Sequence, residues 1–161
     1  MKRTIFIGQA MPRKKNDLHD WPSLNSWLYS INLTHEQIVA NCYYSALVDY
    51  FPGVKGSSHR VPSHEEIVEE QDRLKNTILT FGPEIVVPIG RQSIAYCLGE
   101  KVGPLTGYIG RSFEVDPFGL LDKKMPVIPL PHPSGASTWY HKSEHKELLK
   151  KALRVLRISL G

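Results

Sequence analysis

The chain has 161 residues, a formal net charge of +4 and a sequence pI near 9.1. Hydrophobic residues make up 41% and charged residues 22%, a composition typical of globular rather than disordered proteins. Because this length is enough to bury a full hydrophobic core, we expect one domain over residues 1–161. The modest positive charge suits an anionic partner without identifying it.

The sequence argues against a membrane span, a signal peptide and a disulfide framework. No apolar run approaches the roughly 20 residues that a membrane span needs. Met1-Lys2-Arg3 leads directly into a strand-like segment rather than into a signal-peptide core. Cys42 and Cys97 form no CxxC pair, which indicates neither a disulfide framework nor a metal-ligand set. We therefore expect a cytoplasmic protein with no membrane partner.

The first third of the chain alternates apolar runs with helix signals. Thr4 to Ile7 predicts a buried strand, which a glycine ends and a loop over Gln9 to Pro22 follows. A short helix is expected around Leu24 to Ile31, and Thr34-His35-Glu36-Gln37 fits a capping box for a further helical turn. Val39 to Tyr44 is then expected as the second strand.

The middle of the chain predicts a loop, a long helix and a third strand. Gly, Pro and Ser residues mark Phe51 to Pro62 as a loop, and Ser63-His64-Glu65-Glu66 is a second capping box. One long helix is expected to run from there to Gly82-Pro83, with a core face formed by Ile67, Leu74, Ile78 and Phe81. Ile85 to Gly90 is expected as the third strand.

The last third completes an alternating pattern. Arg91 to Leu98 predicts a helix that Gly99 ends, Tyr108 to Val115 predicts an extra hairpin, and Val127 to Leu130 predicts a fourth strand. A C-terminal helix carries an apolar stripe of Leu149, Ala152, Leu153, Leu156 and Leu160. Strands alternating with helices predict an α/β fold, a three-layer αβα sandwich around a mostly parallel sheet of about four strands.

Polar residues stand at the ends of these apolar runs, where ligands bind in parallel sheets. Gly8-Gln9-Ala10-Met11-Pro12 follows the first strand, and Asn41 lies within the second. His132-Pro133-Ser134-Gly135-Ala136-Ser137 follows the last strand. Together they indicate a ligand site at one edge of the sheet.

The first and last of these stretches resemble the two signature motifs of uracil-DNA glycosylases, and their order and spacing agree across nearly the whole chain. Ile38 to Asn41 is similar to a strand of the thermophilic iron–sulfur branch, whose asparagine reads uracil. Glu84 to Gly90 resembles the next strand and glycine turn of that branch. The resemblance implies the fold of that superfamily and a protein that binds a base flipped out of DNA.

The resemblance implies a base-binding group formed by Gly8, Gln9, Ala10, Trp21 and Asn41. Gln9 would contact the pyrimidine, and the Asn41 amide would match the O4 acceptor and N3 donor of uracil, a pattern that cytosine reverses. Trp21 stands close to the offset of the aromatic residue that stacks on the base, a contact worth roughly 1–3 kcal/mol. The alternatives are a satisfied structural amide for Asn41 and core packing for Trp21.

The resemblance assigns catalysis to His132, which matches the histidine that hydrogen-bonds uracil O2 as the base departs as an anion. The chain departs from the family where a residue positions water. The usual position in the first motif is Ala10, and the acidic position of the iron–sulfur branch falls at Arg13. Asp17 and Asp20, in the same loop, are the candidates to hold a water against the sugar carbon. Their alternative is an ordinary exposed loop acid.

The DNA-binding candidates come from both motifs. Arg13 and Lys14 place positive charge beside the first motif. In the second, the resemblance implies that a tight turn grips a phosphate, and that an aromatic side chain just after it fills the space left by the base. The residues involved are Ser134, Gly135, Ser137, Trp139 and Tyr140. Trp139 and Tyr140 could instead pack locally.

No cofactor is expected. The iron–sulfur branch needs four cysteines, and here Ser45 stands where one ligand would fall. Hydrolysis of an N-glycosidic bond also needs no metal or organic cofactor.

The leading hypothesis is a monomeric DNA-repair glycosylase that flips and hydrolytically removes uracil or a related deaminated base from DNA. The alternative is a catalytically silent DNA- or nucleotide-binding protein on the same fold, motivated by Ala10 and Arg13. An unrelated nucleotide-binding enzyme would use Gly8 or Gly90 at a helix start, but neither glycine belongs to a GxGxxG or GxxxxGK[ST] pattern.

Overall fold

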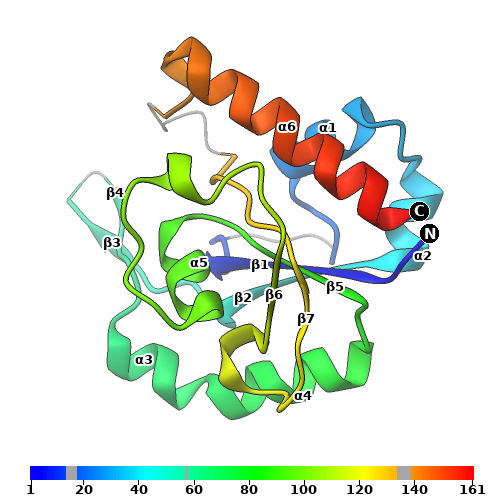
Figure 1. The fold of residues 1–161 in the computed structure, drawn as a ribbon. Coiled ribbons are helices and arrows are strands. Elements are labelled where there is room, and N and C mark those ends of the chain that lie inside the picture. Colours follow the sequence, from blue (N-terminus) through cyan, green and yellow to red (C-terminus); the bar gives the residue numbers. More distant parts are fainter. Residues whose placement is uncertain (14–17, 57, 134–138) are drawn as a thin grey trace.

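The computed structural model describes residues 1–13, 18–56, 58–133 and 139–161, and in these ranges five strands form the central sheet (Figure 1). The order across the sheet is β2-β1-β5-β7-β6. These strands are β1 (Thr4–Ala10), β2 (Cys42–Val48), β5 (Ile85–Pro88), β6 (Phe113–Val115) and β7 (Met125–Val127). A separate hairpin pairs β3 (Val54–Lys55) with β4 (Ser58–His59).

The helices follow the alternation that the sequence predicts. They are α1 (Pro22–Ser30), α2 (His35–Asn41), α3 (His64–Glu69), α4 (Gln71–Phe81), α5 (Arg91–Leu98) and α6 (Ser143–Leu160). Short 3-10 turns lie at η1 (Leu105–Gly107), η2 (Pro117–Gly119) and η3 (Trp139–His141). Among the helices of the described ranges, none is both long and apolar enough to cross a bilayer.

Strand β1 lies inside the sheet and pairs in parallel on both edges. Thr4 is level with Cys42 of β2 and with Ile85 of β5. β5 pairs in parallel with β7, and an isolated parallel bridge joins Ile89 to Leu130 beyond the ends of those strands. The carboxyl ends of these parallel strands therefore meet at one edge of the sheet.

Helices cover both faces of the sheet, which confirms the predicted three-layer α/β fold. Successive β1 residues face opposite sides, so Phe6 packs in one core cluster while Ile5 and Ile7 pack in the other. Helices α1 and α6 close the first cluster, and α3 and α4 close the second, as Figure 1 shows on opposite sides of the sheet. The predicted stripe on α6 is largely buried, with Ala152, Leu153, Leu156 and Leu160 in the core.

Local capping signals place several helix ends correctly. The side chains of Thr34 and Ser63 each accept a hydrogen bond from the backbone N–H three residues later. The side chains of Gln37 and Glu66 accept one from the backbone N–H of Thr34 and Ser63, which completes both predicted capping boxes. Gly99 ends α5 in the left-handed conformation, as expected. The agreement is strongest where the signal is local, because a cap needs only neighbouring residues.

Apart from the shifted ends of the first and fourth strands and the short β3–β4 hairpin inside the loop expected over Phe51 to Pro62, three predictions about the elements are wrong. The second strand begins at Cys42 rather than Val39, because α2 continues from its capping box through Asn41. Tyr108 to Val115 is no hairpin, because Phe113 pairs with Val127 of β7 and supplies a fifth, antiparallel strand to a sheet expected to have about four.

The third error concerns the long helix, which is broken at Glu70 into α3 and α4. The Glu70 carboxylate accepts a hydrogen bond from the backbone N–H of Asp49, just beyond the end of β2, at 2.6 Å. No glycine or proline marks this break in the sequence, and the contact depends on chain segments that meet only in the folded protein.

Arg73 of α4 covers the outer edge of β2, an edge strand whose backbone has no neighbouring strand on that side. Its guanidinium donates to the carbonyls of Ala46 and Leu47 at 2.8 and 3.1 Å, and to the Ser45 hydroxyl at 3.2 Å. This contact satisfies strand carbonyls that a sheet edge would otherwise leave to water.

Arg73→Met should therefore lower the free energy of unfolding by about 2 kcal/mol, because it removes hydrogen bonds from a charged donor while keeping the aliphatic stem. Urea unfolding followed by circular dichroism measures the change. Lys75→Met, an exposed position on the same helix, is the matched control. Equal losses in the two variants would show that Arg73 does not secure the edge.

Candidate functional site

A pocket of about 380 Å³ opens at the carboxyl-end side of the parallel strands. Its walls come from the end of β1, the segment before α1, the middle of β2, the segment around the β3–β4 hairpin and the loop after β7. The lining residues are Gln9, Ala10, Met11, Pro12, Asp20, Trp21, Pro22, Tyr44, Ser45, Phe51, Pro52, His59, Arg60 and His132. Of the residues singled out in the sequence, the pocket brings together Gln9, Ala10, Asp20, Trp21 and His132.

Gly8 lets the indole of Trp21 lie directly against β1. A Cβ atom at this position would stand 3.1 Å from Trp21 Cη2 and 3.5 Å from Cζ3. The absence of a side chain at Gly8 therefore sets how deep the indole sits. Gly8 itself is buried and shapes the pocket through Trp21.

Trp21 is held by a hydrogen-bonded loop. Its backbone N–H donates to the carbonyl of His19 at 2.9 Å, and the Asn25 amide donates to the same carbonyl at 2.9 Å. The buried Tyr44 hydroxyl in turn donates to Asn25 Oδ1, and burial raises the pKa of Tyr44, which keeps it a neutral donor. Sequence reasoning missed Asn25 and Tyr44, whose roles arise from contacts between segments.

Trp21 and His132 form an aromatic corner of the pocket. Their ring centroids lie 5.9 Å apart with an interplanar angle of 51°, and the Tyr44 ring meets Trp21 edge-on at 6.2 Å. A flat ligand on the indole would therefore have the imidazole beside its edge. The indole is half-buried and packs against the core. Core packing and stacking on a base, the two interpretations considered for Trp21, are therefore compatible.

His132 follows the last parallel strand and is fixed from two sides. Gly90 donates its N–H to the carbonyl of Leu130 at 2.9 Å, and a Cβ atom at Gly90, whose φ is 87°, would stand 3.6 Å from His132 Cβ and 3.8 Å from Cδ2. The Tyr140 hydroxyl donates to the His132 carbonyl. Although the side chain as a whole is exposed, partial burial of the ring lowers the pKa of His132 below its ordinary value. The imidazole is therefore neutral at neutral pH.

Trp139 and Tyr140 pack locally, the alternative left open for both. Trp139 stacks on His145 with centroids 4.3 Å apart, and Tyr140 meets Trp27 edge-on at 5.9 Å. Both are only partly exposed. In this structure Tyr140 supports the backbone of His132.

Asn41 does not share the pocket, which contradicts the expectation that it lies beside Gln9. It ends α2, and its amide donates to the carbonyl of Gln37 at 3.0 Å. Because it precedes the amino end of β2, it stands roughly 20 Å along the strand from the level of Gln9. The β2 residues that line the pocket are Tyr44 and Ser45, and the Ser45 hydroxyl is bonded to Arg73 of α4.

Several predicted residues lie outside the described part of the chain: Lys14, Asp17, Ser134, Gly135 and Ser137. Arg13 is described and exposed, and its guanidinium lies 5.3 Å from the ring centroid of Phe51, a pocket residue. This places one of the predicted cations at the rim. Within the described ranges, no group of three or more His, Cys, Asp or Glu side chains is arranged to hold a metal ion.

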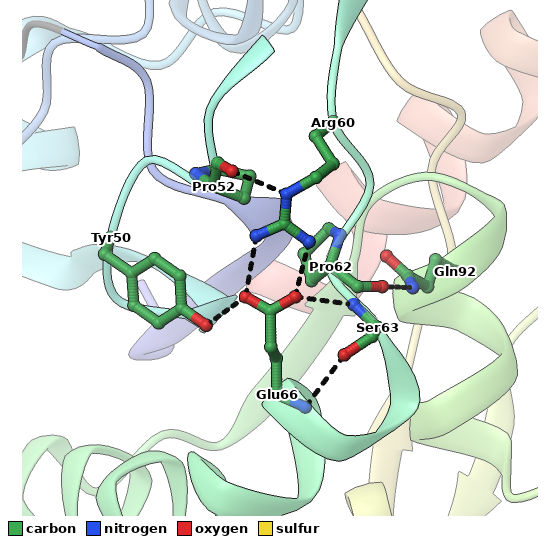
Figure 2. Close-up of polar contacts among 7 residues, drawn as sticks. All are labelled: Tyr50, Pro52, Arg60, Pro62, Ser63, Glu66 and Gln92. Carbon is green, nitrogen blue, oxygen red and sulfur yellow. Dashed lines mark hydrogen bonds and ion pairs between the residues drawn. The ribbon is translucent and has the colours of Figure 1, made fainter. Parts of the chain in front are cut away.

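Sequence reasoning also missed the wall formed by Phe51, Pro52, His59 and Arg60, because this stretch appeared only as a loop. Figure 2 shows how it is fastened: the Arg60 guanidinium and the Tyr50 hydroxyl both point at the Glu66 carboxylate at the start of α3. The Arg60 guanidinium, together with Tyr50, holds the pKa of Glu66 well below its usual range. Glu66 is therefore an anion at neutral pH.

Gly8→Ala should displace the indole of Trp21, because the added methyl group stands within 3.1 Å of it. Tryptophan fluorescence of the variant should differ from wild type, and this difference should vanish in a Trp21→Phe background. Gly103→Ala is the matched control, since a Cβ there meets nothing within 4 Å. Identical spectra for Gly8→Ala and wild type would show that the contact does not set the indole position.

The imidazole of His132 should titrate with a midpoint below the ordinary value of about 6.5, because burial disfavours its charged form. Trp21→Ala should open one side of the ring to water and move the midpoint upward. NMR titration of the histidine ring protons measures both. A midpoint at or above the ordinary value in the wild type would contradict the environment described here.

This geometry can be compared with known proteins. No curated protein matches the chain. The sequence profile of the Uracil DNA glycosylase superfamily matches residues 2–157, nearly the whole chain. The parallel sheet with helices on both faces agrees with that match. The chain therefore belongs to the Uracil DNA glycosylase superfamily.

Proposed function

We propose that this protein is a DNA-repair glycosylase that hydrolytically removes uracil or a related deaminated base from DNA. The observation that carries the proposal is the corner of Trp21 and His132, a flat ring beside a hydrogen-bond donor in one pocket. The pocket volume of about 380 Å³ falls within the roughly 300–1,000 Å³ of small-molecule sites. Since a base inside a duplex cannot enter such a pocket, the target nucleotide must be flipped out.

In this proposal the base lies on the face of Trp21, with Gln9 at its edge. Both residues line the pocket, and the backbone of Gln9 continues β1 at its carboxyl end. Stacking holds any flat base, so selection depends on polar contacts at the edge. Since Asn41 lies elsewhere, we propose Gln9, an uncharged polar residue at the carboxyl end of β1, for this task.

His132 stabilises the departing base. When the bond between the sugar carbon C1′ and the base nitrogen breaks, the electron pair stays on the base, and negative charge spreads to its carbonyl oxygens. A neutral imidazole can donate one hydrogen bond to such an oxygen where the charge develops. The lowered pKa of His132 keeps it in this form without a competing positive charge in the resting pocket.

Asp20 is our proposed holder of the attacking water. Of the two loop acids considered, Asp20 lines the pocket and Asp17 lies outside the described residues. An ionised carboxylate accepts a hydrogen bond from water and favours positive charge on the sugar as the base leaves. Ala10 provides no such group, although it stands where family members position water.

The DNA contacts belong to the same proposal. Arg13 at the rim, with Lys14, Ser134, Gly135 and Ser137, would bind phosphates on either side of the flipped nucleotide. The local contacts of Trp139 and Tyr140 favour a supporting role over a wedge between bases. One domain, a monomer, a cytoplasmic location and no cofactor remain our predictions.

Wild-type protein should release base from labelled oligonucleotides containing uracil, hypoxanthine or xanthine, detected as alkali-sensitive abasic sites. His132→Ala should lower the rate about 10²–10³-fold, as removal of one donor to a developing anion does. His35→Ala, at the start of α2 and outside the pocket lining, is the control.

The ionic strength must be fixed across these assays, because phosphate contacts make affinity depend on salt. DNA binding without release from any of the three substrates would favour the alternative, a catalytically silent binding protein. Equal rates for His132→Ala and wild type would remove His132 from the mechanism.

A further inference from the structure

A second imidazole, that of His59, also lines the pocket. His59 belongs to neither of the two family motifs. His59 ends β4, and its ring meets Phe51 edge-on with centroids 5.2 Å apart. Asp20 and His132 line the same pocket. Among the described residues, the pocket lining thus includes the carboxylate of Asp20, the guanidinium of Arg60 and two imidazoles, and the chemistry proposed above uses only one of the imidazoles.

His59 is held at the pocket by hydrogen bonds across the neck of the β3–β4 hairpin, where Pro52 and Gly53 lie beside Arg60. The next residue, Arg60, donates its backbone N–H to Gly53 at 2.9 Å and its Nε–H to Pro52 at 2.7 Å, which joins the two sides of the hairpin. The Arg60 guanidinium also grips both oxygens of Glu66, at 2.6 and 3.0 Å.

The anchor of this neck is itself fixed (Figure 2). Glu66 lies in the first turn of α3, where its carboxylate accepts the Ser63 N–H at 3.1 Å and its own N–H donates to the Ser63 hydroxyl at 3.2 Å. The Tyr50 hydroxyl donates to the same carboxylate. Tyr50 and Arg60, on the two sides of the hairpin, are therefore both bonded to the start of α3. His59, next to Arg60, lines the pocket.

Hydrolysis needs a proton acceptor as well as a group that holds water. A neutral imidazole takes a proton near neutral pH far more readily than a carboxylate does, which suits it to general base catalysis. A water molecule has two O–H bonds and can donate one to each of two acceptors. Asp20 and an imidazole nitrogen together would leave its lone pair free to point at the sugar.

We infer that His59 is a catalytic residue, the general base for the water that attacks C1′, with Asp20 as the second acceptor and Arg60 and Glu66 as positioning residues. This inference rests on the proposed function. It also explains how a chain with Ala10 in the first motif can activate water.

The step balances as follows. A neutral nitrogen of His59 takes one proton from the water, whose oxygen forms the new bond to C1′. The bond between C1′ and the base nitrogen breaks, and its electron pair leaves with the base, which His132 stabilises as an anion. The products are an abasic sugar with a hydroxyl group at C1′ and an anionic base. That base takes up the proton from His59, or it takes one from solvent while His59 releases its proton to solvent; either route restores the neutral imidazole.

The test is single-turnover base release from the best substrate of the wild type, using His59→Ala and His59→Gln. Both variants should lose about 10²–10⁴ in rate while keeping the DNA affinity of the wild type, since general base catalysis contributes that much. Added imidazole should restore part of the His59→Ala activity. His35→Ala with imidazole is the control.

A double variant examines the shared water. If Asp20 and His59 act on one water, Asp20→Asn combined with His59→Ala should lose less than the product of the two single losses. Fully multiplicative losses would overturn the shared role. Glu66→Gln should lower the rate by loosening the neck, and thermal unfolding of each variant shows whether the fold persists.

The remaining outcomes distinguish a failure of the His59 role from a failure of the proposed glycosylase activity. Wild-type rates in both His59 variants would overturn the role of His59 and leave the glycosylase proposal standing. Lost activity that imidazole cannot restore, accompanied by lost DNA binding, would assign His59 to binding instead. A protein–DNA adduct that survives denaturation in the wild type and is absent in His59→Ala would show direct attack by the imidazole. No release by the wild type would overturn both proposals.

Discussion

Strand β1 is hydrogen-bonded in parallel on both of its edges, and this pairing determines where the polar ends of the chain's apolar segments can lie. With β2 on one side and β5 on the other, the end of β1 that carries Gln9 lies at the same edge of the sheet as the loop after β7. The bridge between Ile89 and Leu130 extends that alignment to His132. A slip of one residue in β1 would turn Gln9 to the other face of the sheet. The site therefore depends on backbone register before any side-chain contact.

Two further constraints complete the pocket, one on each wall. On one side, Gly8 admits the indole of Trp21 and hydrogen bonds through Asn25 hold the segment that carries it. On the other, the ion pair of Arg60 and Glu66 ties the hairpin neck to α3. Both walls are thus positioned by groups already bonded elsewhere in the protein, which is the condition for a site that needs little reorganisation when it binds.

The sequence predicted the features that depend on local signals or on the order of short motifs that resemble a known family. Both capping boxes, the Gly99 helix end and the convergence of Gln9 with His132 are of this kind. The prediction that Asn41 lies in the second strand was wrong because the boundary between α2 and β2 is set by where pairing with β1 begins, at Cys42. His59 and its neighbours were missed because they lie in a stretch without periodicity, and their place in the pocket depends on an ion pair to a residue on a separate element. Arg60 and Glu66 are only six residues apart in the sequence, but nothing in their spacing indicates that the pair holds this stretch at the pocket.

The central claim is that Trp21 forms the surface on which the flipped base rests. The most direct measurement follows the three tryptophan indole N–H signals by NMR while an oligonucleotide with a non-hydrolysable 2′-fluorinated uracil nucleotide is added. The signals can be assigned with Trp21→Phe, Trp27→Phe and Trp139→Phe. Our account predicts that the Trp21 signal shifts most on adding this DNA, and that DNA with an abasic site at that position produces a smaller shift, because it has no base to stack. Saturable binding that leaves Trp21 unchanged would contradict the account.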